Sequence, residues 1–473
     1  MRGIFKTSLL TPIILLLINQ HGLAQQFIGL NTTKYAGIQH MATNPAWVNT
    51  CDKGTEVMLF SANVLAGTNA YSVRKKFVFE GFNGQGLPGV DYFPDEQRYQ
   101  KHLWANLEIN GPAFSTTYKD VHHVGMFTRV RQLYRAGNIT SSEFLLIGNK
   151  VPEIYNGQNV DFKKAGFTTH TFAEVGFTYG QTIRDDNYHI ARVGVSLKYL
   201  MGFVAGSIYT ESLQYQQKSA DSIGYIKGDL TILYTHNMNS FIDANVQNDI
   251  TGWFQRAGRW GLGLDIGGQY EYHPDGNPNK ETPYLFSIAA SITDIGSIGY
   301  VADTGSGTYE LNIANIDTAQ FLKRYEDIDQ YLIRLQQDTA INAHNGDIAQ
   351  KFRVGLPTAF RLNIDYNATD KLNFAVNILL NMRGSRKLYK PAYVSYFNFT
   401  PSYGGKNFKV GLPFSVIGYQ TFAIGTVLQV GPFYMGSTSV LSMLMSSRLR
   451  NIDGYVGFAY KFIDKKKQFG YYK

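Results

Sequence analysis

Eight ionisable side chains occupy alternate positions among small and polar residues: Glu174, Arg192, Lys198, Asp265, Glu271, Arg361, Asp365 and Lys461. Acids and bases that face one enclosed space can form either a catalytic set or a lattice of salt bridges. A hydrolase would also need a Ser or Asp nucleophile beside a His, and the spacing singles out none. We expect a structural lattice and no enzymatic activity.

Other chemical motifs are weak or missing. The sequence has no Gly-x-Ser-x-Gly elbow, His-Glu-x-x-His helix, phosphate loop or Cys-x-x-Cys pair. His122 and His123 are adjacent, so in a strand they point to opposite faces and cannot bind one metal together. Asp243, Asn245 and Asp249 lack the Gly and terminal Glu of a calcium loop, which favours a surface loop. We predict no catalytic residue, no metal and no cofactor.

Hydrophobic alternation gives the fold. Val193, Val195, Leu197 and Tyr199 alternate with Arg192, Gly194, Ser196 and Lys198, and the same period recurs in 261–272, 360–366, 372–380 and 455–462. Each such strand has one apolar and one polar face. Nine further stretches resemble strands (55–65, 103–117, 122–132, 168–182, 223–236, 283–293, 392–400, 407–417 and 420–438), which predicts about 14 strands.

A soluble β-sandwich would give the same local alternation, but three features favour a membrane barrel. Several stretches have nine to twelve residues, and about 9–11 residues cross a bilayer at a tilt. Tyrosines end the apolar faces, and the composition is 14% aromatic with only 17% charge. We therefore predict an all-β, transmembrane antiparallel β-barrel with an N-terminal plug segment and one helical loop insertion.

Both ends of the chain fit export to the outer membrane of a Gram-negative bacterium. Residues 1–24 have the basic start, short apolar core and small-residue cleavage site of a signal peptide. Gly457, Tyr460 and Phe462 have the spacing of the signal by which barrels are delivered to their insertion machinery. Most such barrels end on the last aromatic, whereas here a basic tail, 464–473, follows. The net charge of +8 is otherwise scattered, so we expect no nucleic-acid partner.

Two segments lack the strand period. Residues 25–54, which contain Asn44, Pro45 and Ala46, form either a plug inside the barrel 55–463 or a disordered periplasmic leader. Residues 315–340 have helical spacing. This helix either covers the barrel mouth or binds a partner, and its apolar face comprises Phe321, Tyr325, Ile328, Leu332 and Leu335.

The order of short motifs resembles long-chain fatty-acid-transporter-like outer-membrane barrels, most of all their uncharacterised Bacteroidota branch. The motifs are Tyr35-Ala36-Gly37 with Asn44-Pro45-Ala46, then Leu264-Asp265-Ile266-Gly267, Thr293-Asp294-Ile295-Gly296 and Val354-Gly355-Leu356-Pro357-Thr358. The resemblance implies a 14-stranded barrel with an N-terminal plug. For the transporters, the resemblance implies passage of hydrophobic molecules through the barrel. A sister group provides barrel subunits of the type IX secretion apparatus, for which the resemblance implies partner binding.

Two functions remain open at this point. The first is passive transport of hydrophobic or amphipathic small molecules, which fits the expected plug. The second is a non-conducting scaffold or partner subunit in an envelope or protein-secretion assembly, which fits the helix at 315–340 and the basic tail. Outer-membrane lipid is a partner in both.

Overall fold

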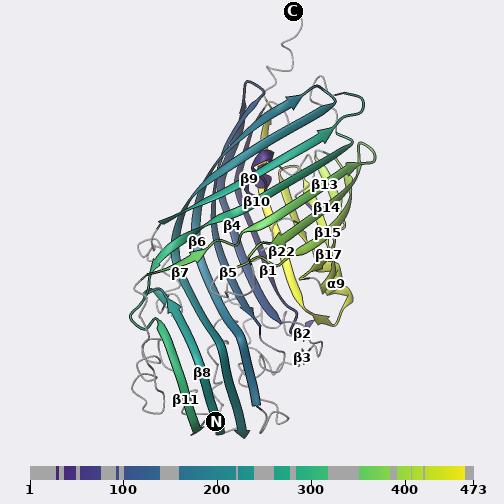
Figure 1. Cartoon of the computed structure of the whole chain (residues 1–473). Coiled ribbons are helices and arrows are strands. Elements are labelled where there is room, and N and C mark those ends of the chain that lie inside the picture. The colour runs from purple at the N-terminus through teal and green to yellow at the C-terminus, as the bar shows by residue number, and fades with distance from the viewer. Residues whose placement is uncertain are drawn as a thin grey trace, which may run out of the picture.

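The computed structural model describes residues 28–30, 37–48, 54–75, 92–94, 101–138, 159–219, 222–238, 260–276, 284–317, 351–383, 391–405, 407–418 and 421–463. These residues form one closed antiparallel β-barrel of 14 strands (Figure 1). The prediction of an all-β barrel of about 14 strands is confirmed. The signal peptide, the basic tail and the five apolar residues of the predicted partner helix lie outside the described residues.

The strands, in chain order, are β1 Gly54–Thr68, β2 Tyr71–Arg74, β3 Tyr92–Pro94, β4 His102–Tyr118, β5 His122–Gly137, β6 Asn159–Asp185, β7 His189–Ser219, β8 Ser222–Tyr234, β9 Trp260–Tyr272, β10 Phe286–Val301, β11 Gly307–Asp317, β12 Lys351–Gly355, β13 Ala359–Asn367, β14 Leu372–Asn381, β15 Tyr396–Gly404, β16 Phe408–Gly411, β17 Phe414–Ile417, β18 Thr421–Ile424, β19 Thr426–Val430, β20 Phe433–Ser437, β21 Arg448–Leu449 and β22 Asn451–Ile463. The described helices are short: η1 Gly37–Ala42, η2 Pro45–Trp47 and α9 Val440–Met445. Within the described residues, none is a long apolar helix able to cross a bilayer.

The wall closes where the last strand meets the first. β1 pairs with β4 on one side and with β22 on the other, from Gly54 opposite Ile463 to Gly67 opposite Asn451. Three wall strands are interrupted, since β12 continues into β13, β16 into β17 and β18 into β19. β2, β3 and β21 form a small separate sheet. We call the end with the short turns 119–121, 186–188 and 368–371 the turn end, and the opposite end the loop end.

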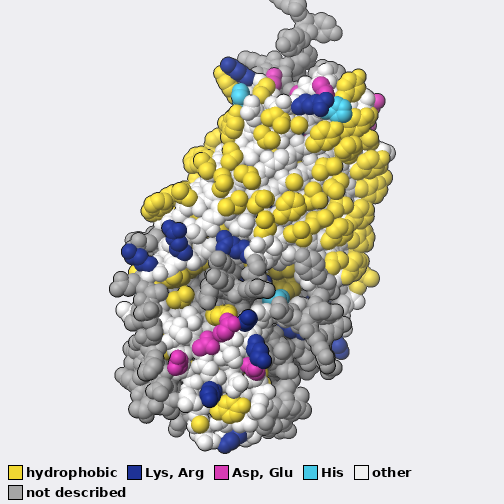
Figure 2. Space-filling model, in the orientation of Figure 1, with side chains coloured by type: hydrophobic (Ala, Val, Ile, Leu, Met, Phe, Trp, Pro, Cys, Tyr) yellow, Lys and Arg dark blue, Asp and Glu magenta, His cyan; other side chains and the backbone are white. Residues whose placement is uncertain are grey.

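The two faces of the wall differ in the way that the alternation predicts. On β7, Leu197 is 64% exposed, whereas its neighbours Ser196 and Lys198 are fully buried. On β9, Leu262 is exposed and Asp265 is buried. The outward apolar side chains form a continuous band over the part of the barrel nearer the turn end (Figure 2). We call this band the apolar belt.

Some strands extend far beyond the apolar belt. β7 has 31 residues, about 100 Å at about 3.3 Å per residue. Beyond Tyr199, no large apolar side chain of this strand is exposed among the described residues. There β7 pairs with β8, and β8 pairs with β11, which extends the sheet toward the loop end (Figure 1). We call the loop-end parts of β6 and β7, together with β8 and β11, the loop-end sheet.

The strand count is right although several assignments behind it were wrong. The stretch 420–438 is two wall strands, because the chain reverses at residues 431–432 between β19 and β20. The stretch 223–236 is not a full wall strand but β8 of the loop-end sheet. The predicted strands 122–132 and 168–182 are too short, since β5 continues to Gly137 and β6 begins at Asn159.

The predicted helix 315–340 begins too early. Residues 315–317 form the end of β11, where Ile316 and Asp317 pair with Ile223 and Ser222 of β8. Pairing with a neighbouring strand therefore outweighs the local helical period there. Residues 318–340 lie outside the described part of the chain.

Candidate functional site

The inward residues of β7 show which groups fill the lumen at successive heights along the barrel. From the turn end, its inward residues are Arg192, Gly194, Ser196 and Lys198. Three of them mark successive layers: Arg192 an ion pair near the turn end, Gly194 the N-terminal segment, and Lys198 a charged network near the middle. These layers together are the candidate functional site, because any solute crossing the barrel would have to pass them.

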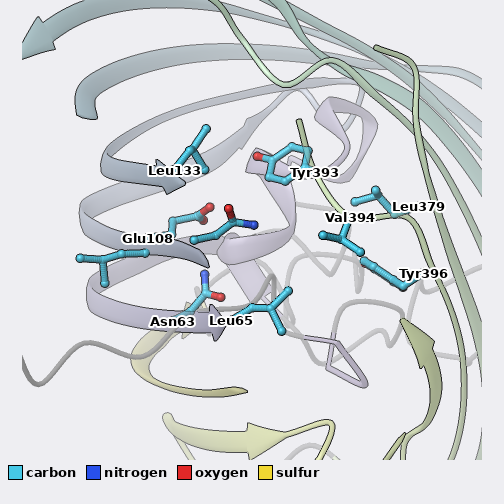
Figure 3. Close-up of a pocket in the computed structure, with 10 residues that line it drawn as sticks. Asn63, Leu65, Glu108, Leu133, Leu379, Tyr393, Val394 and Tyr396 are labelled. Atoms are coloured by element: carbon cyan, nitrogen blue, oxygen red, sulfur yellow. The ribbon is translucent and has the colours of Figure 1, made fainter. Parts of the chain in front are cut away.

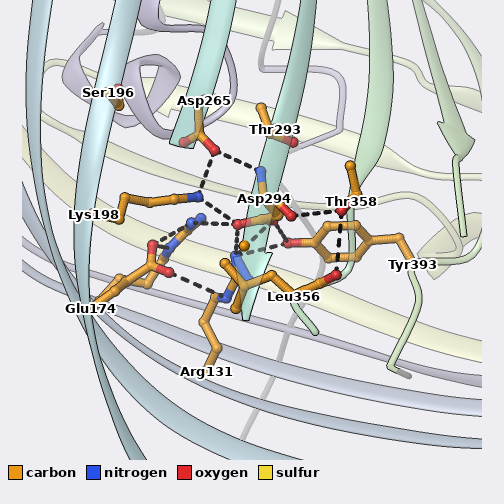
Figure 4. Close-up of polar contacts among 12 residues, drawn as sticks. Arg131, Glu174, Ser196, Lys198, Asp265, Thr293, Asp294, Leu356, Thr358 and Tyr393 are labelled. Carbon is orange, nitrogen blue, oxygen red and sulfur yellow. Dashed lines mark hydrogen bonds and ion pairs between the residues drawn. The ribbon is translucent and has the colours of Figure 1, made fainter. Parts of the chain in front are cut away.

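The central network joins charges from five neighbouring strands (Figure 4). Lys198 Nζ lies 2.6 Å from an oxygen of Asp265 and 2.6 Å from an oxygen of Asp294. Arg131 NH1 contacts Asp294 at 3.0 Å. Glu174 forms a short hydrogen-bonded ion pair with Arg129.

These side chains are almost completely enclosed. Arg131 and Lys198 are each 1% exposed, and Asp265 is 0% exposed. Burial without partners would cost each charge several kcal/mol, so the mutual contacts are what make the arrangement tolerable. The network is a rigid charged layer with little room for a solute.

A β-bulge brings Asp294 into the network. The pairing of β10 with β9 shifts between Ile292 and Ile295, and Asp294 has φ +61°. Its backbone N–H donates to an oxygen of Asp265 at 2.6 Å. The bulge therefore turns an extra carboxylate inward and holds it beside its neighbour.

A chain segment from the loop end completes the network. Residues 391–393, before β15, are buried within the barrel. The Tyr393 hydroxyl lies 3.0 Å from Arg131 NH1 and donates to Asp294 at 3.0 Å. One tyrosine therefore connects the loop-end segment to charges on the opposite wall.

A small cavity lies between this segment and the wall (Figure 3). Its volume is ≈ 20 Å³, which is enough for about one water molecule. Its lining includes Asn63, Glu108, Leu133, Leu379, Tyr393 and Tyr396. Asn63 is fully buried, and neither atom of its amide has a hydrogen-bond partner among the described residues. The site fits a bound water and is too small for a lipid-like molecule.

The N-terminal segment, residues 28–30 and 37–48, lies inside the barrel. Inward glycines on neighbouring strands make room for it, because Gly180 pairs with Gly194 and Gly194 pairs with Gly267. A Cβ on Gly194 would lie 2.3 Å from the carbonyl carbon of Pro45. A Cβ on Gly267 would lie 2.1 Å from the Asn44 side chain. We call this row the glycine groove.

Polar contacts orient the segment in the groove. The Asn44 amide donates to the carbonyl of Gly268 at 3.2 Å, and its oxygen accepts from the N–H of Ala46, which starts η2. Ser291 of β10 donates to the carbonyl of Thr43 at 2.7 Å. The structure thus places Asn44, Pro45 and Ala46, the predicted plug residues, against the wall inside the lumen.

Apolar contacts hold the rest of the segment. Met41 and Val48 are fully buried, together with Phe127 of β5. Burying a side chain of this size contributes about 1.5–3 kcal/mol. Ile28 packs near Trp104, and the Tyr455 hydroxyl donates to the Ile28 carbonyl at 3.0 Å. The segment is held by shape and by hydrogen bonds to backbone atoms.

The layer nearest the turn end is again charged. Arg192 lies 2.9 Å from Glu271, which also accepts from Gln269 at 2.9 Å. Asp365 accepts hydrogen bonds from Tyr284 and Asn373. Glu271 and Asp365 were predicted to face the lumen, and both are buried there.

The remaining predicted residues are spread over the wall. His122 contacts the Tyr179 hydroxyl at 2.8 Å, whereas His123 lies between Thr117 and Thr182. Among the described residues, no group of three or more His, Cys, Asp or Glu is arranged to hold a metal.

The predicted insertion signal falls on β22. Tyr460 is 49% exposed, and a Cβ on Gly457 would lie 2.3 Å from the Tyr434 ring. Phe462 pairs through its backbone with Thr55 of β1. The side chains of Lys461 and Phe462 lie outside the described atoms.

Some residues of the central network were not among the predicted lumen residues. Arg129 and Arg131 are two positions apart in an alternating strand, and this spacing was sufficient to place both in the lumen. The inward position of Asp294 depends on a bulge, which the alternation does not reveal. Tyr393 falls in the predicted strand 392–400, but β15 begins only at Tyr396, so the residue lies in the segment before the strand.

Comparisons with known proteins identify a family and several weakly similar solved structures. A family model described as a family of unknown function, DUF5723, matches residues 45–438. The chain belongs to this family. No curated protein matches the sequence.

Several solved barrels share the general architecture. The translocator domain of the autotransporter NalP from Neisseria meningitidis has 7% identity and a TM-score of 0.35, over 90% of this chain and 94% of that one. The toluene transporter TodX from Pseudomonas putida has 9% identity and a TM-score of 0.32, over 93% and 96%. The transport unit of AIDA-I from Escherichia coli has 9% identity and a TM-score of 0.31, over 88% and 92%.

The close packing of the N-terminal segment in the glycine groove predicts that no side chain larger than that of glycine fits at position 194. Gly194→Ala should displace residues 37–48, because the added methyl group meets the backbone of Pro45. Hydrogen–deuterium exchange should show lost protection in that segment, with a stability loss of about 1–3 kcal/mol. Gly268→Ala is the matched control, since its Cβ has 3.7 Å to the nearest atom. Unchanged protection in Gly194→Ala would contradict the assignment.

Docking of the N-terminal segment should depend on pH through His40. Burial lowers the pKa of His40 from 6.5 to about 3, although a contact with the Leu30 carbonyl opposes this and Lys409 adds to it. His40 binds a proton more readily in the displaced segment than in the docked segment. Docking is therefore strongest above about pH 6.5 and weakens as the pH falls toward 3. Exchange protection of residues 37–48, corrected for intrinsic rates, measures this. His40→Met should remove the dependence, and a persistent dependence would rule out His40 as its source.

The central network should make Lys198 important for stability. Lys198→Met leaves Asp265 and Asp294 without their shared ammonium, which should lower the free energy of unfolding by about 3–5 kcal/mol. Lys163→Met is the control, because its side chain is 74% exposed and pairs only with Asp161; it should cost at most about 1 kcal/mol. Urea titration in lipid vesicles measures both. Equal stabilities would show that the network is not needed for folding.

Proposed function

We propose that this protein resides in the outer membrane of a Gram-negative bacterium and works with a closed lumen, as a scaffold or partner subunit of an envelope or protein-secretion assembly. The apolar belt supports the membrane location, because a closed barrel with lipid-facing side chains leaves no backbone group unpaired in the bilayer. The turn end then faces the periplasm and the loop end faces outward. The proposal assigns the chain no catalytic reaction.

The observation that carries the proposal is the filled lumen. The Arg192–Glu271 layer, the N-terminal segment and the Lys198–Asp265–Asp294 network follow one another along the barrel. A hydrophobic molecule would have to displace buried charges, which is unfavourable unless they find new partners. The cavity beside Tyr393 holds about one water molecule. This arrangement favours a non-conducting role.

The loop-end sheet is the surface that we propose for partner binding. It extends beyond the apolar belt, and charged side chains of both signs are exposed on it beside smaller apolar areas (Figure 2). Lys163, Lys227 and Glu310 are exposed on β6, β8 and β11. Its inner side packs on a cluster that includes Phe203 and Tyr309, so the sheet has its own apolar core.

Passive transport of a hydrophobic or amphipathic molecule is the second candidate. One observation favours it: the N-terminal segment is a separate piece of chain seated by shape in the lumen. Gly29 lies against Val427 and Pro413, where the wall strands are interrupted. A segment held in this way could withdraw as a unit. Transport would then also require rearrangement of the central network.

The closed lumen predicts little ion conductance. The full chain in planar lipid bilayers should show no steady open state, and Gly194→Ala should remain closed because the central network lies farther along the barrel. Steady conductance of the wild type would contradict the closed-lumen proposal.

Native mass spectrometry of the protein from its own membrane distinguishes the two candidates. A stoichiometric protein partner supports the scaffold, and a retained lipid-like molecule without a partner favours transport. Lys163→Glu with Lys227→Glu should weaken partner association by about tenfold or more. Lys119→Glu with Lys371→Glu is the control, since these lysines lie in turns at the opposite end. Equal losses in the two variants would argue against the loop-end sheet as the binding surface.

A further inference from the structure

An exposed apolar helix tip lies at the rim of the barrel. α9 follows β20 and contacts β18, where the backbone N–H of Ile424 donates to Ser442 at 2.7 Å. At its end, Leu444 is 65% exposed and Met445 is 83% exposed, more than any other large apolar side chain among the described residues. Two adjacent apolar side chains this exposed need an apolar environment to cover them.

The apolar belt continues to this tip. Phe422, two residues before the α9 contact on β18, is 60% exposed on the outer face of the wall. Figure 1 places α9 at the edge of the barrel, and in the same orientation the apolar surface of Figure 2 extends to that level. The tip therefore lies where the belt ends on the loop-end side.

Basic residues gather beside the tip. Lys75 Nζ donates to the Leu444 carbonyl at 3.5 Å, so its ammonium lies at the carboxyl end of α9. Arg74 of β2 pairs directly opposite Arg448 of β21. Arg450 follows two residues later. Positive charge is thus concentrated next to an apolar tip.

We infer that α9 and the basic residues Arg74, Lys75, Arg448 and Arg450 form a binding site for phosphate-bearing lipid head groups of the outer leaflet. Leu444 and Met445 enter the acyl-chain region, as apolar residues do at interfacial helices. Two arginines directly opposite each other in an antiparallel pair lie on one face, where guanidinium groups offer donors that suit a phosphate. This inference rests on the outer-membrane location proposed above and adds a lipid class to it.

Lipid binding by the full chain in detergent tests the basic part of the site. Bis-phosphorylated lipid A is the probe, and native mass spectrometry follows its titration. Arg74→Gln with Arg448→Gln should weaken binding by about tenfold or more, since both phosphate contacts are charge-assisted. Lys119→Gln with Lys371→Gln removes the same charge from turns at the opposite end of the barrel and should leave binding unchanged. Equal losses in both pairs, or equal binding of dephosphorylated lipid A, would overturn the inference. Heat-modifiable migration verifies that each variant is folded.

Spin labels in phosphatidylcholine vesicles test the apolar tip. In a Cys51→Ser background, a label at Met445→Cys should be accessible to oxygen and shielded from a water-soluble nickel chelate. A label at Phe422→Cys should behave likewise, and one at Gln214→Cys should be accessible to nickel. If the label at 445 is accessible to nickel while the label at 422 is shielded from it, the α9 inference alone is overturned. If the labels at both positions are accessible to nickel, the membrane location is overturned as well.

Discussion

Hydrogen bonding between neighbouring strands is the constraint on which the rest of this structure depends. In an apolar environment, an unpaired backbone N–H or C=O costs several kcal/mol, so an open sheet edge is excluded there. The chain meets this requirement by pairing β22 with β1 over 13 opposed residues. Closure fixes an outer and an inner face for every wall strand, and the two-residue period then assigns each side chain to one of them.

The inner face creates a second requirement, because closure buries whatever points inward. Lys198 is acceptable there since Asp265 and Asp294 share its ammonium, and Arg131 is acceptable since Asp294 and Tyr393 lie beside it. Where the wall presents glycines instead, space opens for the N-terminal segment. Buried charge and added chain are thus two ways of filling the same lumen, and together they close it.

A closed lumen and an extended wall belong together in the proposed function. The part within the apolar belt would hold the molecule in a bilayer, while β7 and β8 continue beyond it as a sheet with a core of its own. At the rim between these parts, the apolar tip of α9 lies beside basic residues of neighbouring segments, where we propose that lipid head groups bind. Membrane anchoring, lipid contact and partner binding would then occupy successive levels of one continuous sheet.

The sequence by itself determined the fold class and the facing of most strands, because alternation is a local property with a period of two. It identified Arg192, Lys198, Asp265 and Glu271 as lumen residues before any contact was known, and the same period would also have found Arg129 and Arg131. Only the tertiary structure decided which charges meet. Asp294 depends on a bulge whose register is set by β9, and Tyr393 depends on a loop that folds back into the barrel. The glycine groove likewise appears only when Gly180, Gly194 and Gly267 align across three strands, since strand register is a relation between distant segments.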